Sequence, residues 1–277
     1  MNRRWIEALL ADAGRIEIRH LPSGRSMIVD NADDALAAAG RQADRGNLYT
    51  TLNRPQAGIG AGQVQALKDA DIDTVVLLPF DFDPVRPADS ASTDAELASA
   101  IAAREAFVRA MASRGWPAPA KAVSGNGAHA TFRVFLRNDD AARQMLRSLY
   151  TGLKHRYSDD EVLFDPTVRN ASRVWRLYGT VNRKGTATAD RPHRVSAVTL
   201  PADWRRVPTK EIERLASEFE RRREDASIDA SPNRIPIVGR GDFGTLDVVR
   251  WFDAHRHYVG HVGGNVHEVV CPWESEH

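Results

Sequence analysis

The residues best suited to chemistry are Asp81 and Asp83, which end an apolar segment that begins at Asp73. In a strand, side chains two positions apart point to the same face, with Cα atoms roughly 6.6 Å apart. Two carboxylates placed in this way can share a hard cation, which prefers oxygen ligands. Carboxylates on so apolar a strand are costly unless a cation or another partner compensates them. A solvated pair of aspartates at the end of a strand is the alternative interpretation.

A turn with two glycines and a histidine is the second candidate. Residues 124–129 read Ser-Gly-Asn-Gly-Ala-His. Glycines let the backbone approach a ligand closely, and the N–H groups of such a turn suit an anion. His129 begins the next strand on its polar face and could meet a phosphate or a reacting group. An ordinary Asn-Gly hairpin turn followed by an exposed histidine is the alternative.

A third aspartate, Asp165, again closes an apolar strand, directly after Phe164. Arg173, Arg176 and Lys184 follow it. Arginine binds phosphate oxygens bidentately, and a lysine in a loop that ends in glycine adds a point charge. The alternative is an arginine-rich surface whose members pair with nearby acids.

The elements around these residues follow the order strand, helix, strand, strand, helix, strand. From hydrophobic periodicity we expect strands at 73–83, 122–123, 128–136 and 161–164 and helices over 93–115 and 139–154. Thr93 and Glu96 predict a capping box at the start of the first helix. Upstream, we expect strands at 15–20 and 48–52 and a helix over 33–44. This split βαβ order predicts an open antiparallel sheet backed by helices.

The chain changes character after about residue 205. Residues 206–237 read as a charged helix over 209–224 and a linker, and residues 238–277 as a small unit with a helix over 246–254 and a glycine turn between strands. His267, Cys271 and His277 have the ligand types of a zinc site. Packing or solvated histidines are the alternative. We expect this unit to be incomplete, as in a truncated or subdivided multidomain protein.

Composition bounds the classes of function. The 277 residues carry 38 Lys plus Arg against 37 Asp plus Glu, a net charge of +1, and 42% are hydrophobic, which favours a packed core. No apolar run is long enough for a membrane span, and the single cysteine fits a reducing cytoplasm. The balance hides a separation of charge: residues 71–105 hold eight acids and two bases, whereas residues 169–194 hold seven bases and one acid. Such a separation can hold cations at one place and phosphates at another.

Taken together, the Asp-x-Asp strand, the small-residue turn ending in histidine, and the apolar-Asp pair with downstream arginines resemble the archaeo-eukaryotic primase superfamily. More closely, they resemble the primase-polymerase domains of phage, plasmid and mobile-element replication proteins. The resemblance covers roughly residues 5–205. It implies an α+β fold in which an RNA-recognition-motif-like catalytic sheet packs with an N-terminal α/β unit over residues 1–205. A small C-terminal α/β appendage follows over 238–277.

The resemblance also implies roles for individual residues. In that family Asp81, Asp83 and Asp165 would hold two Mg²⁺ or Mn²⁺ ions for in-line phosphoryl transfer. Nucleotide-binding candidates are His129, Arg173, Arg176, Ser124, Asn126 and Lys184. The family's second motif is Ser-x-His, but here Gly127 stands two residues before His129, so N–H groups of the 125–127 turn are an alternative to Ser124.

The function that this resemblance implies is a DNA primase-polymerase that makes primers and extends them. The implied partners are a single-stranded DNA template, an NTP or dNTP, and a helicase domain or protein, with no membrane.

Two other classes of function remain open. One is a non-catalytic single-stranded nucleic-acid binding module on a primase-like fold, with Trp175 and Tyr178 among basic residues for stacking and charge. The other is a different Asp-x-Asp metal-dependent nucleotide enzyme, such as a nucleotide-sugar transferase or a Toprim-type nuclease. The Glu-Gly pair of a Toprim site does not precede Asp81, and the sequence contains no Walker-type phosphate loop.

Overall fold

An antiparallel sheet is built around β5 (Ile72–Pro84), the strand that carries Asp81 and Asp83. The computed structural model describes residues 1–42, 45–229, 258–263 and 266–269. In the β5 sheet the strand order is β10-β6-β7-β5-β4. β8 also pairs with β5 but is not part of this linear order. The remaining strands of this sheet are β4 (Arg54–Pro55), β6 (Ala120–Val123), β7 (Ala128–Arg137), β8 (Val162–Phe164) and β10 (Ala197–Thr199).

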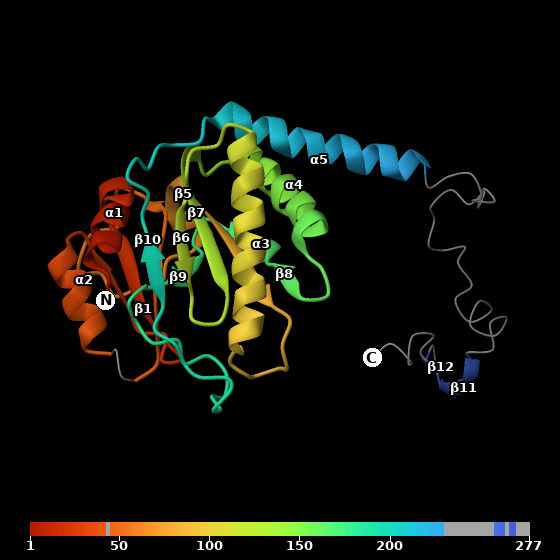
Figure 1. The fold of residues 1–277 in the computed structure, drawn as a ribbon, viewed down its shortest axis with the longest axis horizontal. Coiled ribbons are helices and arrows are strands. Elements are labelled where there is room, and N and C mark those ends of the chain that lie inside the picture. The colour runs from red at the N-terminus through yellow and green to blue at the C-terminus, as the bar shows by residue number, and fades with distance from the viewer. Residues whose placement is uncertain (43–44, 230–257, 264–265, 270–277) are drawn as a thin grey trace. The chain divides into compact units, whose positions relative to one another are not determined.

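The core of the β5 sheet has the split βαβ order expected from the sequence. The chain runs β5, α3 (Asp94–Ser113), β6, β7, α4 (Asp140–Tyr157), β8, and these strands lie side by side as β8-β5-β7-β6. Both helices cover the same face of the sheet (Figure 1). The predicted capping box is confirmed, because the side chains of Thr93 and Glu96 each accept a hydrogen bond from the other's backbone N–H. The predicted α+β class is therefore confirmed.

Aromatic residues fill the layer between this sheet and its helices. Phe80 stacks on Tyr150 of α4, with ring centroids 5.1 Å apart, and also packs on Phe107 of α3. Phe82 lies against Phe107 and Phe164 in the same layer. Because side chains alternate across a strand, burial of Phe80 and Phe82 on the helical side turns the two aspartates of β5 to the other face.

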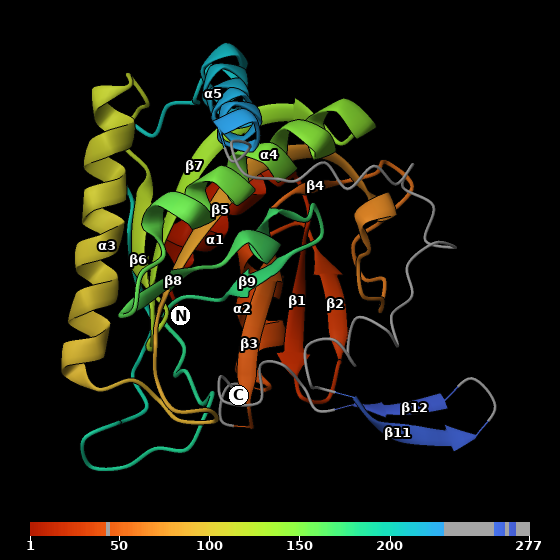
Figure 2. The ribbon, with the colours of Figure 1, turned by 90° about the vertical axis from the view of Figure 1, so that its right-hand side faces the viewer.

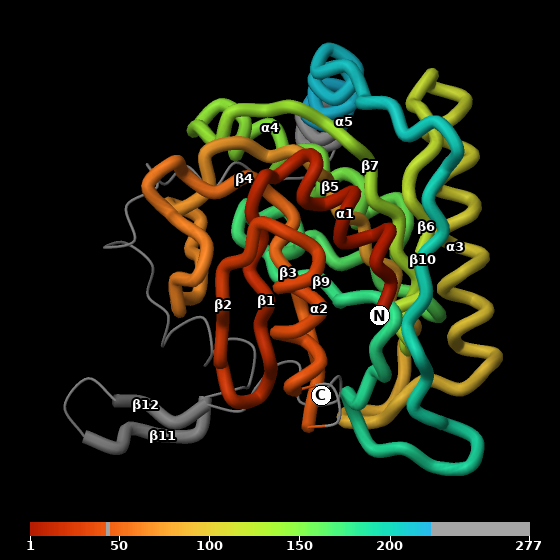
Figure 3. The backbone as a smooth tube through the Cα atoms, turned by 90° about the vertical axis from the view of Figure 1, so that its left-hand side faces the viewer, coloured from red at the N-terminus to blue at the C-terminus, as the bar shows by residue number. Residues whose placement is uncertain are grey.

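A second antiparallel sheet forms the N-terminal part. Its order is β2-β1-β3-β9, and its strands are β1 (Ile16–Leu21), β2 (Ser26–Val29), β3 (Asn47–Thr51) and β9 (Val174–Arg176). Helices α1 (Arg3–Ala13) and α2 (Ala32–Gly40) pack on it, as Figure 3 shows. β9 comes after β8 in the chain, far from β3 in sequence, yet it pairs with β3, with Arg176 opposite Tyr49. β9 is thus the edge strand of this sheet, whereas β8 pairs with β5 in the other sheet; Figure 2 labels both strands.

Short strands account for most differences from the sequence prediction. The sequence does not predict β2, β4, β9 and β10, and three of these strands have only two or three residues: β4, β9 and β10. Two short 3₁₀ helices, η1 (Asp69–Asp71) and η2 (Pro166–Arg169), precede β5 and follow Asp165. Strands of this length carry almost no periodicity of their own, because their pairing depends on partners distant in the sequence.

The chain divides into two compact units, Met1–Asp225 and Ala226–His277. The charged helix expected over 209–224 is α5 (Thr209–Asp229). In the second unit, β11 (Tyr258–Gly263) pairs with β12 (Val266–Val269) in an antiparallel hairpin. The expected helix over 246–254 and the zinc candidates Cys271 and His277 lie outside the described residues, and nothing is described of the side chain of His267 on β12. Within the described ranges, no helix is both long enough and apolar enough to cross a membrane.

Candidate active site

A cavity of about 240 Å³ is lined by both sheets and the loops that join them. All nine residues that the sequence and the resemblance single out for cation or nucleotide binding line it: Asp81, Asp83, Ser124, Asn126, His129, Asp165, Arg173, Arg176 and Lys184. They come from β5, β7, β9 and the segments after β6, β8 and β9. The predicted set, scattered over about a hundred residues of sequence, thus shares one recess.

The three carboxylates reach the cavity from two paired strands. β8 pairs antiparallel with the end of β5, and the Asp165 backbone N–H donates to the carbonyl oxygen of Asp81 at 3.1 Å. One carboxylate oxygen of Asp165 accepts the backbone N–H of Thr167 at 2.7 Å, which caps η2. This hydrogen bond fixes the Asp165 side chain just after the end of β8, beside β5, the strand that carries Asp81.

Asp81 lies directly opposite His129 in the β5–β7 pair. Its Oδ1 atom is 3.2 Å from Nε2 of His129, but the angles of this contact do not make a hydrogen bond, and the buried Oδ1 has no hydrogen-bond partner. A buried carboxylate oxygen without a donor is costly in a folded protein. The observation marks Asp81 Oδ1 as a position that awaits a ligand.

Burial, together with the neighbouring charge of Asp81, raises the pKa of the Asp83 carboxyl to about 6. Arg86, Lys184 and His129 oppose this shift. The side chain is 36% exposed, but it lies in the recess beside a second carboxylate, which disfavours its charged form. A bound cation would offset this repulsion.

The donor set fits a divalent cation that is bound together with a nucleotide. Among the described residues, no three His, Cys, Asp or Glu side chains are grouped closely enough to hold a metal ion by themselves. Mg²⁺ seldom needs such a cage, because one or two carboxylates, water and substrate phosphates complete its octahedral shell. The unpartnered Oδ1 of Asp81 and the raised pKa of Asp83 agree with oxygen ligands of this kind.

His129 is held by a chain of two buried aromatic residues. Nε1 of Trp175 donates to the hydroxyl of Tyr178 at 2.7 Å, and that hydroxyl is 2.8 Å from Nδ1 of His129. The His129 ring also lies on Trp175, with centroids 4.1 Å apart. Since an indole N–H only donates, the Tyr178 hydroxyl is free to donate to Nδ1, which leaves the proton of neutral His129 on Nε2. Nε2 is the nitrogen beside Asp81.

The burial of these aromatic side chains corrects one interpretation of the sequence. In the alternative of a non-catalytic binding module, Trp175 and Tyr178 stack on the bases of single-stranded nucleic acid. Tyr178 is fully buried, and Trp175 is covered by His129. The pair therefore positions His129 and offers no open ring face for a base.

The glycine turn is closed by its own hydrogen bonds. The Ser124 hydroxyl accepts the N–H of Gly127 at 2.9 Å and that of Asn126 at 3.4 Å. The Asn126 side chain accepts the N–H of Ser92 and donates to the carbonyl of Lys184. The expectation that N–H groups of this turn bind phosphate therefore fails at 126 and 127, because the hydroxyl of Ser124 already occupies them.

The second glycine of the turn leaves room for a carboxylate. A Cβ atom at Gly127 would lie 2.5 Å from Oδ1 of Asp83 and 2.7 Å from the carbonyl oxygen of Phe82. Both distances are shorter than any side chain tolerates. Glycine at 127 is thus required for Asp83 to keep its place.

Arg176 is a buried cation without an anion. Only 4% of the residue is exposed, and it donates to the side chains of Asn47, Tyr49 and Asn182. In the part of the chain that is described, no carboxylate lies within ion-pair distance of it, and burial lowers its pKa. A buried guanidinium that faces a cavity and has only neutral partners is well placed to bind an anion.

Arg173 and Lys184 complete the basic side of the cavity. One guanidinium nitrogen of Arg173 donates to the Thr167 hydroxyl at 2.6 Å, and its buried Nε has no partner. Lys184 is exposed, and its charge lowers the pKa of Asp83. Both side chains thus have donors left for a ligand.

Two members of the basic stretch are already paired. Arg191 binds the carboxylate of Glu96 at 2.7 Å, and Arg194 binds that of Asp94 at 2.6 Å. These four residues tie the loop before β10 to the start of α3. The expected separation into cation-binding and phosphate-binding stretches is therefore wrong for these residues, because the stretches partly neutralise each other. Arg173, Arg176 and Lys184 give the cavity its basic character together with Arg86, which also lines it and lies 3.7 Å from the Asp83 carboxylate.

Sequence reasoning missed Tyr49 and Asn182. Tyr49 lines the cavity and lies beneath the Arg176 guanidinium, 4.6 Å from the ring centroid. The Asn182 side chain accepts from Arg176 and from the Lys184 N–H and donates to the Ser124 carbonyl. Both residues stand in segments that the resemblance includes, and a tyrosine or asparagine without its spatial partners has no distinguishing pattern in one sequence.

No known family model and no curated protein matches this chain. Three solved structures do. The primase-polymerase AEP domain of cyanophage S-2L has 18% identity and a TM-score of 0.46, and the alignment covers 77% of this chain and 95% of that one. A crystal structure of primase RepB′ has 17% identity and a TM-score of 0.42, covering 84% and 69% of the two chains.

The third structure is the catalytic domain of primase RepB′ in complex with initiator DNA. It has 16% identity and a TM-score of 0.43, and the alignment covers 82% of this chain and 97% of that domain. Each of the three is described as a primase. These likenesses concern the course of the chain, and the role of the cavity is argued below from its own residues.

Proposed function

We propose that the chain is a primase-polymerase, a metal-dependent nucleotidyltransferase that starts and extends strands on a single-stranded DNA template. One observation carries the proposal: three carboxylates share a cavity with a buried arginine, and among the described residues the buried Oδ1 of Asp81 has no hydrogen-bond partner and this arginine has no carboxylate within ion-pair distance. A nucleoside triphosphate with its divalent cations supplies both missing partners, because it brings metal to the carboxylates and phosphate to the arginine.

The basic side chains bind the triphosphate in this proposal. Arg176 is preorganised by its three hydrogen bonds and by Tyr49, so it loses little freedom when phosphate oxygens arrive. Arg173 and Lys184 neutralise further charge at the other walls of the cavity. His129 donates from Nε2 to a phosphate oxygen, with its ring held by Tyr178 and Trp175.

Asp81, Asp83 and Asp165 would hold the divalent cations, Mg²⁺ or Mn²⁺. When bound, such ions neutralise developing charge on the phosphates and lower the pKa of the attacking hydroxyl. The 3′-hydroxyl oxygen loses its proton to solvent and forms a bond to the α-phosphorus, and the bond from that phosphorus to the pyrophosphate leaving group breaks. The residues of the cavity orient both reactants, which is the main contribution of a protein to phosphoryl transfer.

The proposed partners follow from the reaction. A template strand and nucleoside triphosphates are its substrates, and one of the similar structures was determined with initiator DNA. A helicase domain or protein that exposes the template is the further partner implied by the resemblance.

Incorporation of labelled nucleotides on single-stranded DNA tests the proposal. The chain is incubated with template, Mn²⁺ or Mg²⁺, and NTPs or dNTPs, with and without a primer. We expect products with the wild type and none with the Asp81→Ala, Asp83→Ala double variant, whereas Asp160→Ala, at an exposed acid on the surface, remains active. Equal activity of the double variant and the wild type would show that the assigned site is wrong.

A further inference from the structure

An exposed aromatic residue lies among arginines at the far end of β7. Phe135 is 52% exposed, and the guanidinium carbons of Arg206 and Arg54 lie 5.6 and 5.9 Å from its ring centroid. Arg137 follows two positions later on the same face of β7. We call Arg54, Phe135, Arg137 and Arg206 the Phe135 surface.

The strand pairing places these residues on one face of the β5 sheet. Arg137 is opposite Thr74 on β5, and Thr74 is opposite Arg54 on β4, so the two arginines stand in one row across three strands. Arg206 joins them through the residue that follows it, because the N–H of Val207 bonds to the carbonyl of Arg133. The surface is therefore built mainly on paired strands.

The charge of the surface is only partly balanced. Asp12, which is buried, binds Arg133 and also Arg206, the latter at 3.2 Å. Arg54 donates to the backbone carbonyl of Asp12. Within the described residues, no carboxylate lies within ion-pair distance of Arg54 or Arg137. Among the described residues, Asp12 is thus the one carboxylate within ion-pair distance of any of Arg54, Arg133, Arg137 and Arg206, which leaves an excess of positive charge around the Phe135 ring.

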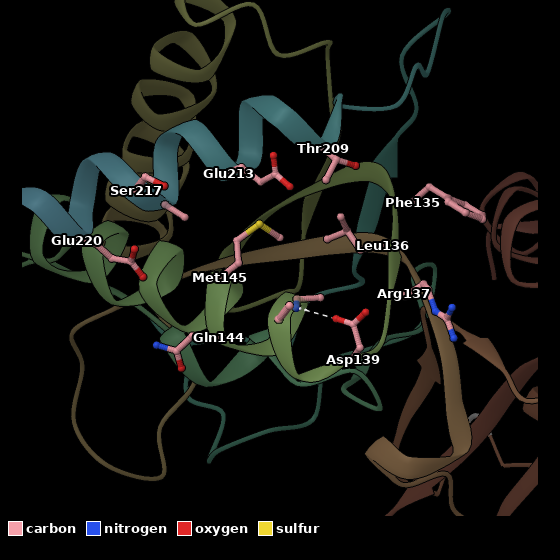
Figure 4. A pocket seen from close by; sticks show the side chains of 13 residues that line it. Phe135, Leu136, Arg137, Asp139, Gln144, Met145, Thr209, Glu213, Ser217 and Glu220 are labelled. Atoms are coloured by element: carbon pink, nitrogen blue, oxygen red, sulfur yellow. Dashed lines mark hydrogen bonds between the residues drawn. The ribbon is translucent and has the colours of Figure 1, made fainter.

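Acidic residues lie in the groove beside this surface. A groove of about 520 Å³ between β7 and α5 is lined by Phe135 and Arg137 and also by Asp139, Glu213 and Glu220. In Figure 4 the two glutamates lie on the α5 side of Leu136 and Met145, whereas Phe135 and Arg137 lie on the opposite side. Asp139 is engaged as the cap of α4, since it accepts the N–H of Ala142.

We propose that the Phe135 surface binds single-stranded nucleic acid, with a base stacked on Phe135 and phosphates held by the arginines. An aromatic ring among basic side chains is the combination that binds single strands without regard to sequence, because every base offers a ring face. His129 and Phe135 are six residues apart on β7, roughly 20 Å by the rise of a regular strand. The surface is thus a contact separate from the cavity, which does not depend on the proposed catalysis.

The test is the affinity for a fluorescent oligothymidylate, measured by anisotropy with EDTA and without nucleotide, so that nucleotidyl transfer plays no part. We expect Phe135→Ala to weaken binding by roughly 5- to 150-fold, the effect of losing one stacked base, and Phe135→Tyr to retain it. Arg137→Ala should also lower the slope of log affinity against log salt by about 0.7, as for one lost phosphate contact.

Arg205→Ala is the matched control, because Arg205 is an exposed neighbour of Arg206 that pairs with Asp203. It should leave the affinity and the salt slope close to those of the wild type. Wild-type affinity of both Phe135→Ala and Arg137→Ala would overturn the proposal, as would equal losses in Phe135→Tyr and Phe135→Ala. Since the ring is exposed, unfolding temperatures of these variants should match the wild type and exclude a folding defect.

Discussion

Asp81 and His129 face each other across the β5–β7 pair, with Oδ1 of Asp81 3.2 Å from Nε2 of His129. This contact joins the two kinds of residue that the cavity brings together. Asp81 belongs to the carboxylates, and His129 stands beside the basic groups. A residue that alters the orientation of His129 should therefore affect catalysis without touching the nucleotide.

Tyr178→Phe removes the hydroxyl between Trp175 and His129. The His129 ring then loses the partner of Nδ1, so we expect kcat to fall roughly 10-fold with a smaller change in KM. Nitrogen NMR of the His129 ring should show a change in tautomer balance, which a merely structural role of Tyr178 would not cause. An unchanged tautomer together with an unchanged kcat would contradict the role of this chain.

The raised pKa of Asp83 predicts a pH-dependent stability of the metal-free protein. The folded carboxyl, with a pKa of about 6, binds its proton more tightly than the unfolded one. Its stabilising contribution is thus complete below the unfolded pKa of about 4 and is lost as the pH rises through about 6. Asp83→Asn removes this loss, so in EDTA we expect it to melt at a higher temperature than the wild type above about pH 6, and the difference to shrink toward pH 4.

The exposed acid Asp160 provides the control for this comparison. Asp160→Asn should change the melting temperature little, and equally across the pH range. If the gain from Asp83→Asn were the same at acidic and neutral pH, the proton linkage assigned to Asp83 would be wrong.

Arg176→Gln tests the triphosphate site. It removes the buried charge but keeps a side chain that can bond to Asn47 or Asn182. Since a hydrogen bond to a charged group contributes about 1.5–3 kcal/mol, we expect the KM for nucleotide to rise roughly 10- to 150-fold. Arg205→Ala, remote from the cavity lining, should leave KM unchanged. A normal KM for nucleotide in Arg176→Gln would show that the triphosphate binds elsewhere.

Gly127→Ala tests the packing between the turn and the carboxylates. The added Cβ would stand 2.5 Å from the Asp83 oxygen and cannot be accommodated without a shift of β5 or the turn. We expect a loss of incorporation by at least 10-fold, since small displacements of reacting groups have effects of this size. Gly24→Ala is the control for a glycine substitution, because an added Cβ there meets nothing within 4 Å. Gly24 has a positive φ, so this control also includes the backbone strain of an alanine in that conformation. Normal activity of Gly127→Ala would contradict the assigned place of Asp83.

Local patterns explain which parts of the fold could be predicted. The alternation of Phe and Asp in β5 identifies one face for the core and one for the site, and Thr93 with Glu96 marks the start of α3. These signals involve residues a few positions apart, so one sequence contains them in full. The nine cavity residues were singled out by their places at a strand end, in a turn or in a cluster of arginines, and their roles are those that the family resemblance implies.

Long-range partners explain what was missed. Tyr49 supports Arg176 only because β3 pairs with β9, across more than a hundred residues of sequence. Likewise Tyr178 bonds to His129 through an arrangement that neither segment indicates alone. The regional charge counts failed for Arg191 and Arg194 for the same reason, because counts along a chain do not show which acid lies beside which base.

A crystal structure with Mn²⁺ and a non-hydrolysable nucleoside triphosphate tests the central claim most directly. We predict anomalous density for manganese next to Asp81, Asp83 and Asp165, with phosphate oxygens on Arg176 and within reach of His129 Nε2. Manganese or triphosphate bound away from these residues, while the cavity keeps its present contacts, would contradict the account of the site.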